Sequence, residues 1–381
     1  MFSEVNEVSD FKHSETFFDD FELQPLLPNK LSHYGPGVAI GDTNSDGKNE
    51  IVVSSAKGQP ITINHIESQA ITSKKIPSAD SHSVSEDMSP LIFDADKDGD
   101  MDLFVVSGGV EAEIGSSELK DRLYLNDGSG NYNVAPAGSL PSLQVSGSAA
   151  AVADFDRDGD LDLFVGGRLR RGEYPTSPKS TLLRNDTSDD KIVKFSDATK
   201  DVSGALENCG MVTSALWSDA DGDGWIDLIL SIEWGPIKIF LNKKGKLVES
   251  TSQSGLSSYK GWWNGLAARD LDGDGDMDYV VTNFGLNTKY HPSKKKPAQI
   301  YYGRFGDEKK ASIVEAKVSE DCILPVRGKS CSQNAMPFVA KKFRTYHSFA
   351  SATLTDIYSC LLYTSDAADE GLGVDLGGRR I

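Results

Sequence analysis

Residues 154–167 read DFDRDGDLDLFVGG, an acidic loop followed at once by an apolar run. The loop has carboxylates at positions one, three, five and nine (Asp154, Asp156, Asp158 and Asp162) and a glycine at position six. Alternating carboxylate oxygens around a sharp glycine turn suit a hard divalent cation such as Ca²⁺. The segment therefore predicts a metal loop that leads directly into a buried strand.

The same pattern occurs five times, with starts 51 to 65 residues apart. Position twelve, a bidentate Glu in helix-flanked EF-hand loops, is Val or Leu in every copy, which excludes that class. Short apolar runs precede and follow each loop, so each loop is expected to join two strands. The predicted ligands of about five structural Ca²⁺ ions are Asp42, Asn44, Asp46 and Glu50; Asp94, Asp96, Asp98 and Asp102; Asp154, Asp156, Asp158 and Asp162; Asp219, Asp221, Asp223 and Asp227; and Asp270, Asp272, Asp274 and Asp278.

Two details of the loops carry separate expectations. The first copy has Asn44 where the others have Asp, so it should bind a cation more weakly. Position seven should coordinate through its backbone carbonyl, so the side chain there, for example that of Asp160, is expected to point outward.

A second repeated phrase follows the loops, as in RLYLNDGSGNY from Arg122. It consists of an apolar run, an Asn-led polar turn and another run, which indicates a hairpin. Loop and hairpin together give four strands per repeat, and radial repetition of such units is typical of β-propellers. A sixth unit from Gln299 has lost the ligand pattern, with Arg304, Gly306 and Ser312 at positions one, three and nine, and predicts a blade without metal.

The DxDxDGxxD loops with LFVGG-like strands resemble FG-GAP/VCBS repeats, the blades of integrin-α-like propellers. Phrases such as GGRLRRGEYP from Gly166 and GWWNGLAARD from Gly261 resemble bacterial VCBS-repeat proteins that carry an ASPIC/UnbV module, similar to cartilage acidic protein. The resemblance covers about residues 11–359 and implies seven blades in an intact protein. It predicts an all-β, calcium-binding propeller, of which about six four-stranded blades lie in this chain.

We divide the chain into four parts. Residues 1–29 form a lead-in, and residues 30–318 form the blades. Residues 319–359 form an insertion between blades, with a small helical segment that packs on the propeller. Residues 360–381 begin CLLYTSDAADE, which reads as a translated sequencing adapter, so we exclude them from the fold.

Composition fits a metal-binding repeat protein. The formal charge is −18, and the five loops supply 19 carboxylates at the predicted ligand positions, so metal binding would account for much of this negative charge. No basic patch indicates nucleic acid, and no apolar stretch is long enough to span a bilayer. The first residues have no signal-peptide pattern; because such propellers are typically extracellular or on the cell surface, we expect a signal peptide to be missing from this fragment. Pairing of Cys322 with Cys331 stays open.

Function is less determined than fold. No catalytic motif is present, so we predict a binding module for a protein or a glycan. The alternatives are an architectural spacer of a long surface protein, or a polysaccharide lyase or hydrolase with its active site on the propeller face. The five tryptophans are expected to fill wedges between blades rather than to bind sugar rings. Arg168, Arg170 and Arg171 are expected to form local ion pairs rather than an anion clamp.

Overall fold

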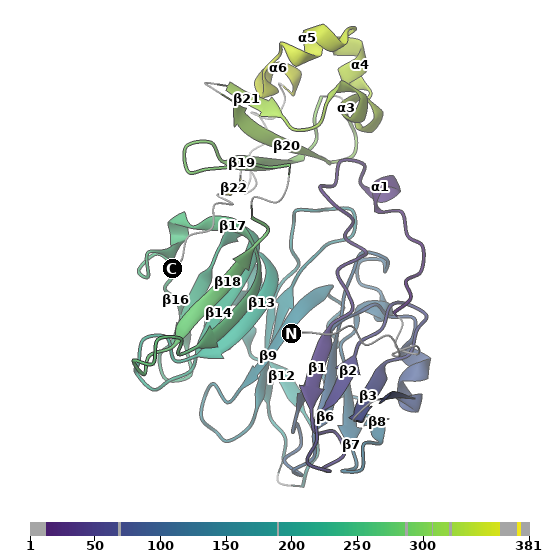
Figure 1. The fold of residues 1–381 in the computed structure, drawn as a ribbon, viewed down its shortest axis with the longest axis vertical. Coiled ribbons are helices and arrows are strands. Elements are labelled where there is room, and N and C mark those ends of the chain that lie inside the picture. Colours follow the sequence, from purple (N-terminus) through teal and green to yellow (C-terminus); the bar gives the residue numbers. More distant parts are fainter. Residues whose placement is uncertain are drawn as a thin grey trace.

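The computed structural model describes residues 13–67, 70–188, 190–285, 289–306, 308–319 and 322–358, and the backbone of 372–374. Four antiparallel four-stranded units follow one another along the chain (Figure 1). Their strands are β1 (Val38–Gly41), β2 (Glu50–Val53), β3 (Thr62–Glu67) and β4 (Ala70–Lys75); β5 (Asp87–Phe93), β6 (Asp102–Ser107), β7 (Arg122–Asn126) and β8 (Tyr132–Val134); β9 (Gly147–Ala153), β10 (Asp162–Gly167), β11 (Thr181–Asn185) and β12 (Phe195–Asp197); and β13 (Met211–Ser218), β14 (Asp227–Pro236), β15 (Lys238–Asn242) and β16 (Leu247–Glu249). The fifth unit is the hairpin of β17 (Lys260–Arg269) and β18 (Asp278–Asn283).

All five acidic loops have one register. The residue before each loop pairs with the residue at position nine, as in Phe93 with Asp102 and Ala153 with Asp162. We number the five units along the chain as blades 1 to 5; blades 1, 4 and 5 have the same pairing. Every residue of β6 and of β10 is buried, which explains why these strands read as unbroken apolar runs.

The blades stand around a common centre. The first strands of neighbouring blades, β1, β5, β9, β13 and β17, contact one another in that order. The hydrophobic core lies between blades; Phe164 and Leu182 of blade 3, for example, share a cluster with Val212 and Phe240 of blade 4. These features confirm the predicted all-β propeller of four-stranded blades.

The fifth unit differs from the four before it. β17 pairs with β18 on one side and with the end of β14 on the other, so blades 4 and 5 form one six-stranded sheet that ends at β18. The sixth unit is a sheet of its own in the order β21-β20-β19-β22. Its strands are β19 (Ala298–Gly303), β20 (Ser312–Ser319), β21 (Cys322–Pro325) and β22 (Leu372–Val374). β22 lies within residues 360–381, whose origin in an adapter stays a prediction.

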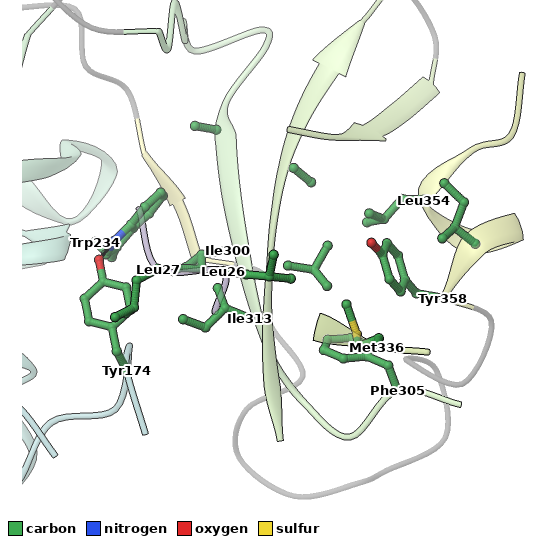
Figure 2. Close-up of a cluster of buried hydrophobic side chains, with 14 of the residues drawn as sticks. Leu26, Leu27, Tyr174, Trp234, Ile300, Phe305, Ile313, Met336, Leu354 and Tyr358 are labelled. Carbon is green, nitrogen blue, oxygen red and sulfur yellow. Dashed lines mark hydrogen bonds between the residues drawn. The ribbon is translucent and has the colours of Figure 1, made fainter. Parts of the chain in front are cut away.

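Short helices cover this last sheet at the top of Figure 1. They are α3 (Lys329–Ala335), α4 (Phe338–Lys342), α5 (Tyr346–Ala350) and α6 (Leu354–Ile357); elsewhere lie α1 (Asp20–Leu23), α2 (Thr199–Ser203) and the 3₁₀ turns η1 (Pro77–His82), η2 (Ser117–Leu119), η3 (Gly204–Asn208) and η4 (Leu256–Ser258). Figure 2 shows that Leu26 lies between Trp234 of the propeller and Tyr358 of the helical part, and that Leu27 lies beside Tyr174. One apolar cluster thus joins the lead-in, the blades and the helices.

Two further observations concern the whole described chain. None of its helices combines the length and the apolarity that a bilayer crossing requires. Cys209, Cys322 and Cys331 are all free thiols.

Candidate metal loops

Loops 1 to 5 (residues 42–50, 94–102, 154–162, 219–227 and 270–278) lie at the end of the blades opposite the helices (Figure 1). The carboxylate at position nine fixes each loop to its blade. In loop 2, Asp102 Oδ2 accepts the amide of Ala95 and Oδ1 accepts the amide of Asn126, both at 2.8 Å. Asp162 and Asp227 make the same two bonds, and all three are at most 1% exposed. The backbone therefore holds the last carboxylate in place.

The carboxylate at position one closes the loop on itself. Asp154 accepts the amides of Asp158 and Gly159, each at 3.1 Å. Gly159 has a φ of +92°, a conformation that side-chain-bearing residues rarely adopt. The bond to the glycine recurs in the other four loops, whose position-six glycines also have positive φ.

Four of the five loops bring predicted ligands together. In each of loops 2 to 5, one oxygen from positions one, three and nine lies within 4.8 Å of the others. The groups are Asp94, Asp96 and Asp102; Asp154, Asp156 and Asp162; Asp219, Asp221 and Asp227; and Asp270, Asp272 and Asp278. The position-five carboxylates, Asp98, Asp158, Asp223 and Asp274, lie outside these groups and accept the amide of position seven. Their role as ligands stays a prediction.

Loop 1 is arranged differently. Glu50 Oε2 accepts both the amide and the hydroxyl of Thr43, and Glu50 Oε1 lies 3.3 Å from Nδ1 of His65. Because position three of loop 1 is Asn44, the loop has no acid there to complete the group of three acids seen in loops 2 to 5. Asp42, Asn44, Asp46 and Glu50 stay predicted ligands, in the loop that the sequence marked as the weakest.

Buried carboxylate oxygens without a hydrogen-bond partner in loops 3 and 4 indicate that these residues suit a bound cation. Asp156 Oδ1 and Asp219 Oδ1 are buried and find no hydrogen-bond partner among the described residues. A buried oxygen with no donor costs free energy unless a cation or water binds it. Several carboxylate oxygens within one small loop are the ligand set that Ca²⁺ prefers.

Burial also raises the pKa of several carboxylates in the loops. Burial raises the pKa of Asp102 and of Asp162 to about 7. Burial and the neighbouring Asp158 raise the pKa of Asp156. Carboxylates that resist ionisation in the metal-free loop are the ones that a divalent cation would neutralise.

Basic side chains at position four of loops 2 and 3 contact the loop that follows. Lys97, at position four of loop 2, forms an ion pair with Asp160, at position seven of loop 3. The expectation that the Asp160 side chain points outward is therefore wrong: it is 7% exposed, because it faces the preceding blade. Arg157, at position four of loop 3, lies over the ring of Trp225 in loop 4, 4.1 Å from its centroid.

The Asn of each later hairpin bridges two blades. Asn242 Nδ2 donates to Phe155 O of loop 3 at 2.7 Å and to Ile226 O of loop 4 at 3.0 Å. Asn126 and Asn185 make the same pair of bonds, each to position two of the preceding loop and to position eight of their own. The sequence marked these residues as turn formers; their role between blades was missed.

The basic loop after β10 forms ion pairs rather than an anion clamp, but the expectation that these pairs are local is correct only for Arg170, because Arg168 and Arg171 reach neighbouring blades. Arg168 is buried against Glu233, which also accepts the hydroxyl of Tyr174. Arg170 pairs with Glu173 at 2.6 Å, and Arg171 pairs with Glu113 at 3.1 Å.

The tryptophans pack largely as expected. Trp217 stacks on Phe155 of the neighbouring blade, with ring centroids 6.2 Å apart. Trp234 and Trp262 lie 5.3 Å apart in the cluster under the helices. Trp225 is the half-exposed ring beneath Arg157. These rings serve packing, and none of the four forms an open aromatic platform.

A cavity of about 250 Å³ lies between the loops that follow β6 and β10. Its lining mixes apolar side chains, such as Ile114 and Leu169, with Gln144, Arg170 and Lys179. A small concave site with a few polar groups is where a ligand of a binding module would be sought first.

These observations define the class: a β-propeller whose blades carry acidic loops. Residues 94–165 and 219–281 match the family profile described as FG-GAP-like repeat. These two segments, which hold loops 2, 3, 4 and 5, are therefore similar to FG-GAP-like repeats. No curated protein sequence matches the chain.

Solved structures give loose similarities only. One is a lectin from Agrocybe aegerita described as recognising non-reducing terminal N-acetylglucosamine (16% identity, TM-score 0.42, 77% of this chain and 77% of that chain). Others are BBS1N in complex with ARL6DN (11%, 0.39, 77% and 79%) and a putative exo-β-1,3-galactanase from Bifidobacterium bifidum (9%, 0.36, 79% and 92%). At these values they assign no function.

Proposed function

We propose that this protein is a calcium-stabilised β-propeller of the extracellular space or cell surface that acts as a protein- or glycan-binding module. The observation that carries the calcium part is the convergence of positions one, three and nine in four loops, with buried oxygens in loops 3 and 4 that find no donor. The FG-GAP-like repeats support it.

Calcium would be structural. Each ion would join the two strands that flank a loop and offset the repulsion between carboxylates that lie within 4.8 Å of one another. Partly exposed acidic loops resemble extracellular sites with dissociation constants of roughly 10⁻⁴ M. At about ten times that concentration of Ca²⁺, each site would add about 1.4 kcal/mol to the free energy of unfolding.

The binding part rests on the architecture. Loops that rest on a rigid scaffold commonly carry binding sites, and the cavity beside Gln144 and Arg170 is the place to test. We favour binding over an enzymatic role because, among the described residues, the groups of three acids within 4.8 Å of one another all belong to the metal loops.

Thermal unfolding in about 2 mM Ca²⁺ and in excess EGTA tests the calcium part. We expect several degrees of stabilisation by Ca²⁺; equal melting temperatures would refute structural calcium. A glycan and protein panel, scored for binding and for cleavage on the calcium-loaded form, tests the rest. Binding without cleavage is expected, cleavage would indicate the lyase or hydrolase, and silence in both would indicate a spacer.

A further inference from the structure

In loop 4, the ammonium group of a lysine contacts two of the predicted ligand carboxylates. Lys243 Nζ lies 2.6 Å from Asp221 Oδ2 and 2.9 Å from Asp223 Oδ2. These residues stand at positions three and five of the loop, where the cation is expected to bind. In the described part of the chain, no other ion pair reaches a carboxylate at either of these positions.

The backbone aims this lysine at the loop. The amide of Asn242 donates to Asp227 Oδ1 at 2.6 Å, which fixes the start of the β15–β16 turn on loop 4. Lys243 follows directly, and its own amide donates to Lys246 O at 2.7 Å across the turn. The Cα of Lys243 is therefore held beside the loop, and only its flexible stem has to reach the two carboxylates.

The corresponding residues of blades 2 and 3 have the opposite charge. Asp127 follows Asn126 in blade 2, and Asp186 follows Asn185 in blade 3. Asp127 accepts bonds within its own turn, while Asp186 pairs with Arg184 at 2.8 Å. An ammonium bound to the loop carboxylates is thus a property of loop 4 and not of the repeat.

An ammonium and a metal ion compete for the same oxygens. Lys243 donates to the lone pairs that positions three and five would use, and it neutralises part of their charge. The contact is half open to water, since the side chains of Lys243, Asp221 and Asp223 are 48%, 30% and 35% exposed. Such a pair is weak and screened, so the lysine can swing into solvent when a divalent ion arrives.

We propose that Lys243 is an internal competitor at loop 4: its ammonium holds Asp221 and Asp223 in the metal-free loop and must leave for a divalent cation to bind. Loop 4 then fills at a higher Ca²⁺ concentration than it would with a neutral residue at position 243, while its carboxylates stay paired at low Ca²⁺. This inference rests on the proposed calcium function of the loops.

Loop 4 also contains its own reporter. Trp225 stands at position seven, where the backbone carbonyl is the expected ligand, and its amide donates to Asp223 Oδ1 at 2.9 Å. An indole beside the ion can transfer excitation to Tb³⁺, a luminescent substitute for Ca²⁺. Trp225→Phe removes this contribution, which separates loop 4 from signals that Trp217 excites.

The experiment measures Tb³⁺ luminescence under indole excitation, and its displacement by Ca²⁺, in the full chain and in Lys243→Met. The matched control is Lys244→Met, which removes the same charge one residue away; in the described structure Lys244 makes no ion pair. We expect Lys243→Met to raise the affinity of the Trp225-dependent site roughly three- to tenfold, and Lys244→Met to change it less than twofold.

Each other outcome is decisive. Equal affinities in the two variants would overturn the inference, because the lysine would then act only through general charge. A Trp225-dependent signal absent from both the parent and Lys243→Met, with calcium stabilisation intact, would also overturn it, because loop 4 would not bind. Absence of any effect of Tb³⁺ or Ca²⁺ on luminescence and on melting would instead refute the calcium function itself.

Discussion

Replacing Asn242 with Ala should remove the hydrogen bonds that join blade 4 to blade 3 and lower the stability of the protein. Asn242 is fully buried, and its amide group donates to Phe155 O and to Ile226 O, while its oxygen accepts the amide of Gly245 at 2.8 Å. Each bond contributes roughly 1 kcal/mol net, and the substitution removes the donor from the buried carbonyl of Phe155 and from the less buried carbonyl of Ile226. We expect a loss of about 3 kcal/mol in the free energy of unfolding.

Urea unfolding followed by circular dichroism, in EGTA and again in Ca²⁺, measures this loss. The melting temperature should fall by roughly 4 °C for a chain of this length. Asn133→Ala is the matched control, because Asn133 is exposed on β8. If Asn242→Ala destabilised the protein no more than Asn133→Ala does, the bridges between blades would not contribute to stability.

Three further changes test other parts of the structure. Asp156→Ala should remove one site and lower the stabilisation by Ca²⁺ by about 1.4 kcal/mol in calorimetric melting, whereas the exposed Asp190→Ala should not; equal responses would refute a cage in loop 3. Arg168→Met should cost roughly 3–5 kcal/mol in urea unfolding because Glu233 loses its buried partner, and adding Glu233→Gln should restore part of it; additive losses would contradict this pairing. Burial raises the pKa of Glu86 from 4.5 to about 7, so its favourable contribution, complete below pH 4.5, is lost as the pH rises through 7. Glu86→Gln should therefore stabilise the protein by about 2 kcal/mol more at pH 8 than at pH 4.5, and a pH-independent effect would contradict the burial argument.

The loops and their strands could be predicted because their signals are local. Nine consecutive residues fix each loop, and the strands on either side pair within a few residues of it. The ligands at positions one, three and nine converge in loops 2 to 5 for this reason.

Contacts between blades could not be predicted in the same way. Asn185 reaches Ala95 across 90 residues of sequence, and Lys97 reaches Asp160 only because loops 2 and 3 become neighbours in space. The prediction for Asp160 considered one loop in isolation and was wrong. Lys243 was overlooked because its partners, Asp221 and Asp223, lie in an earlier strand connection.

The bridges between blades also give assembly a direction. Asn126, Asn185 and Asn242 each reach back to the loop of the blade that precedes them, and each stands on the third strand of its own blade. During synthesis a blade can therefore be secured only after three strands of its successor have left the ribosome. A pause with β14 outside the ribosome and β15 still inside it would expose blade 3 with its loop unsecured, whereas a pause after β15 has emerged would not.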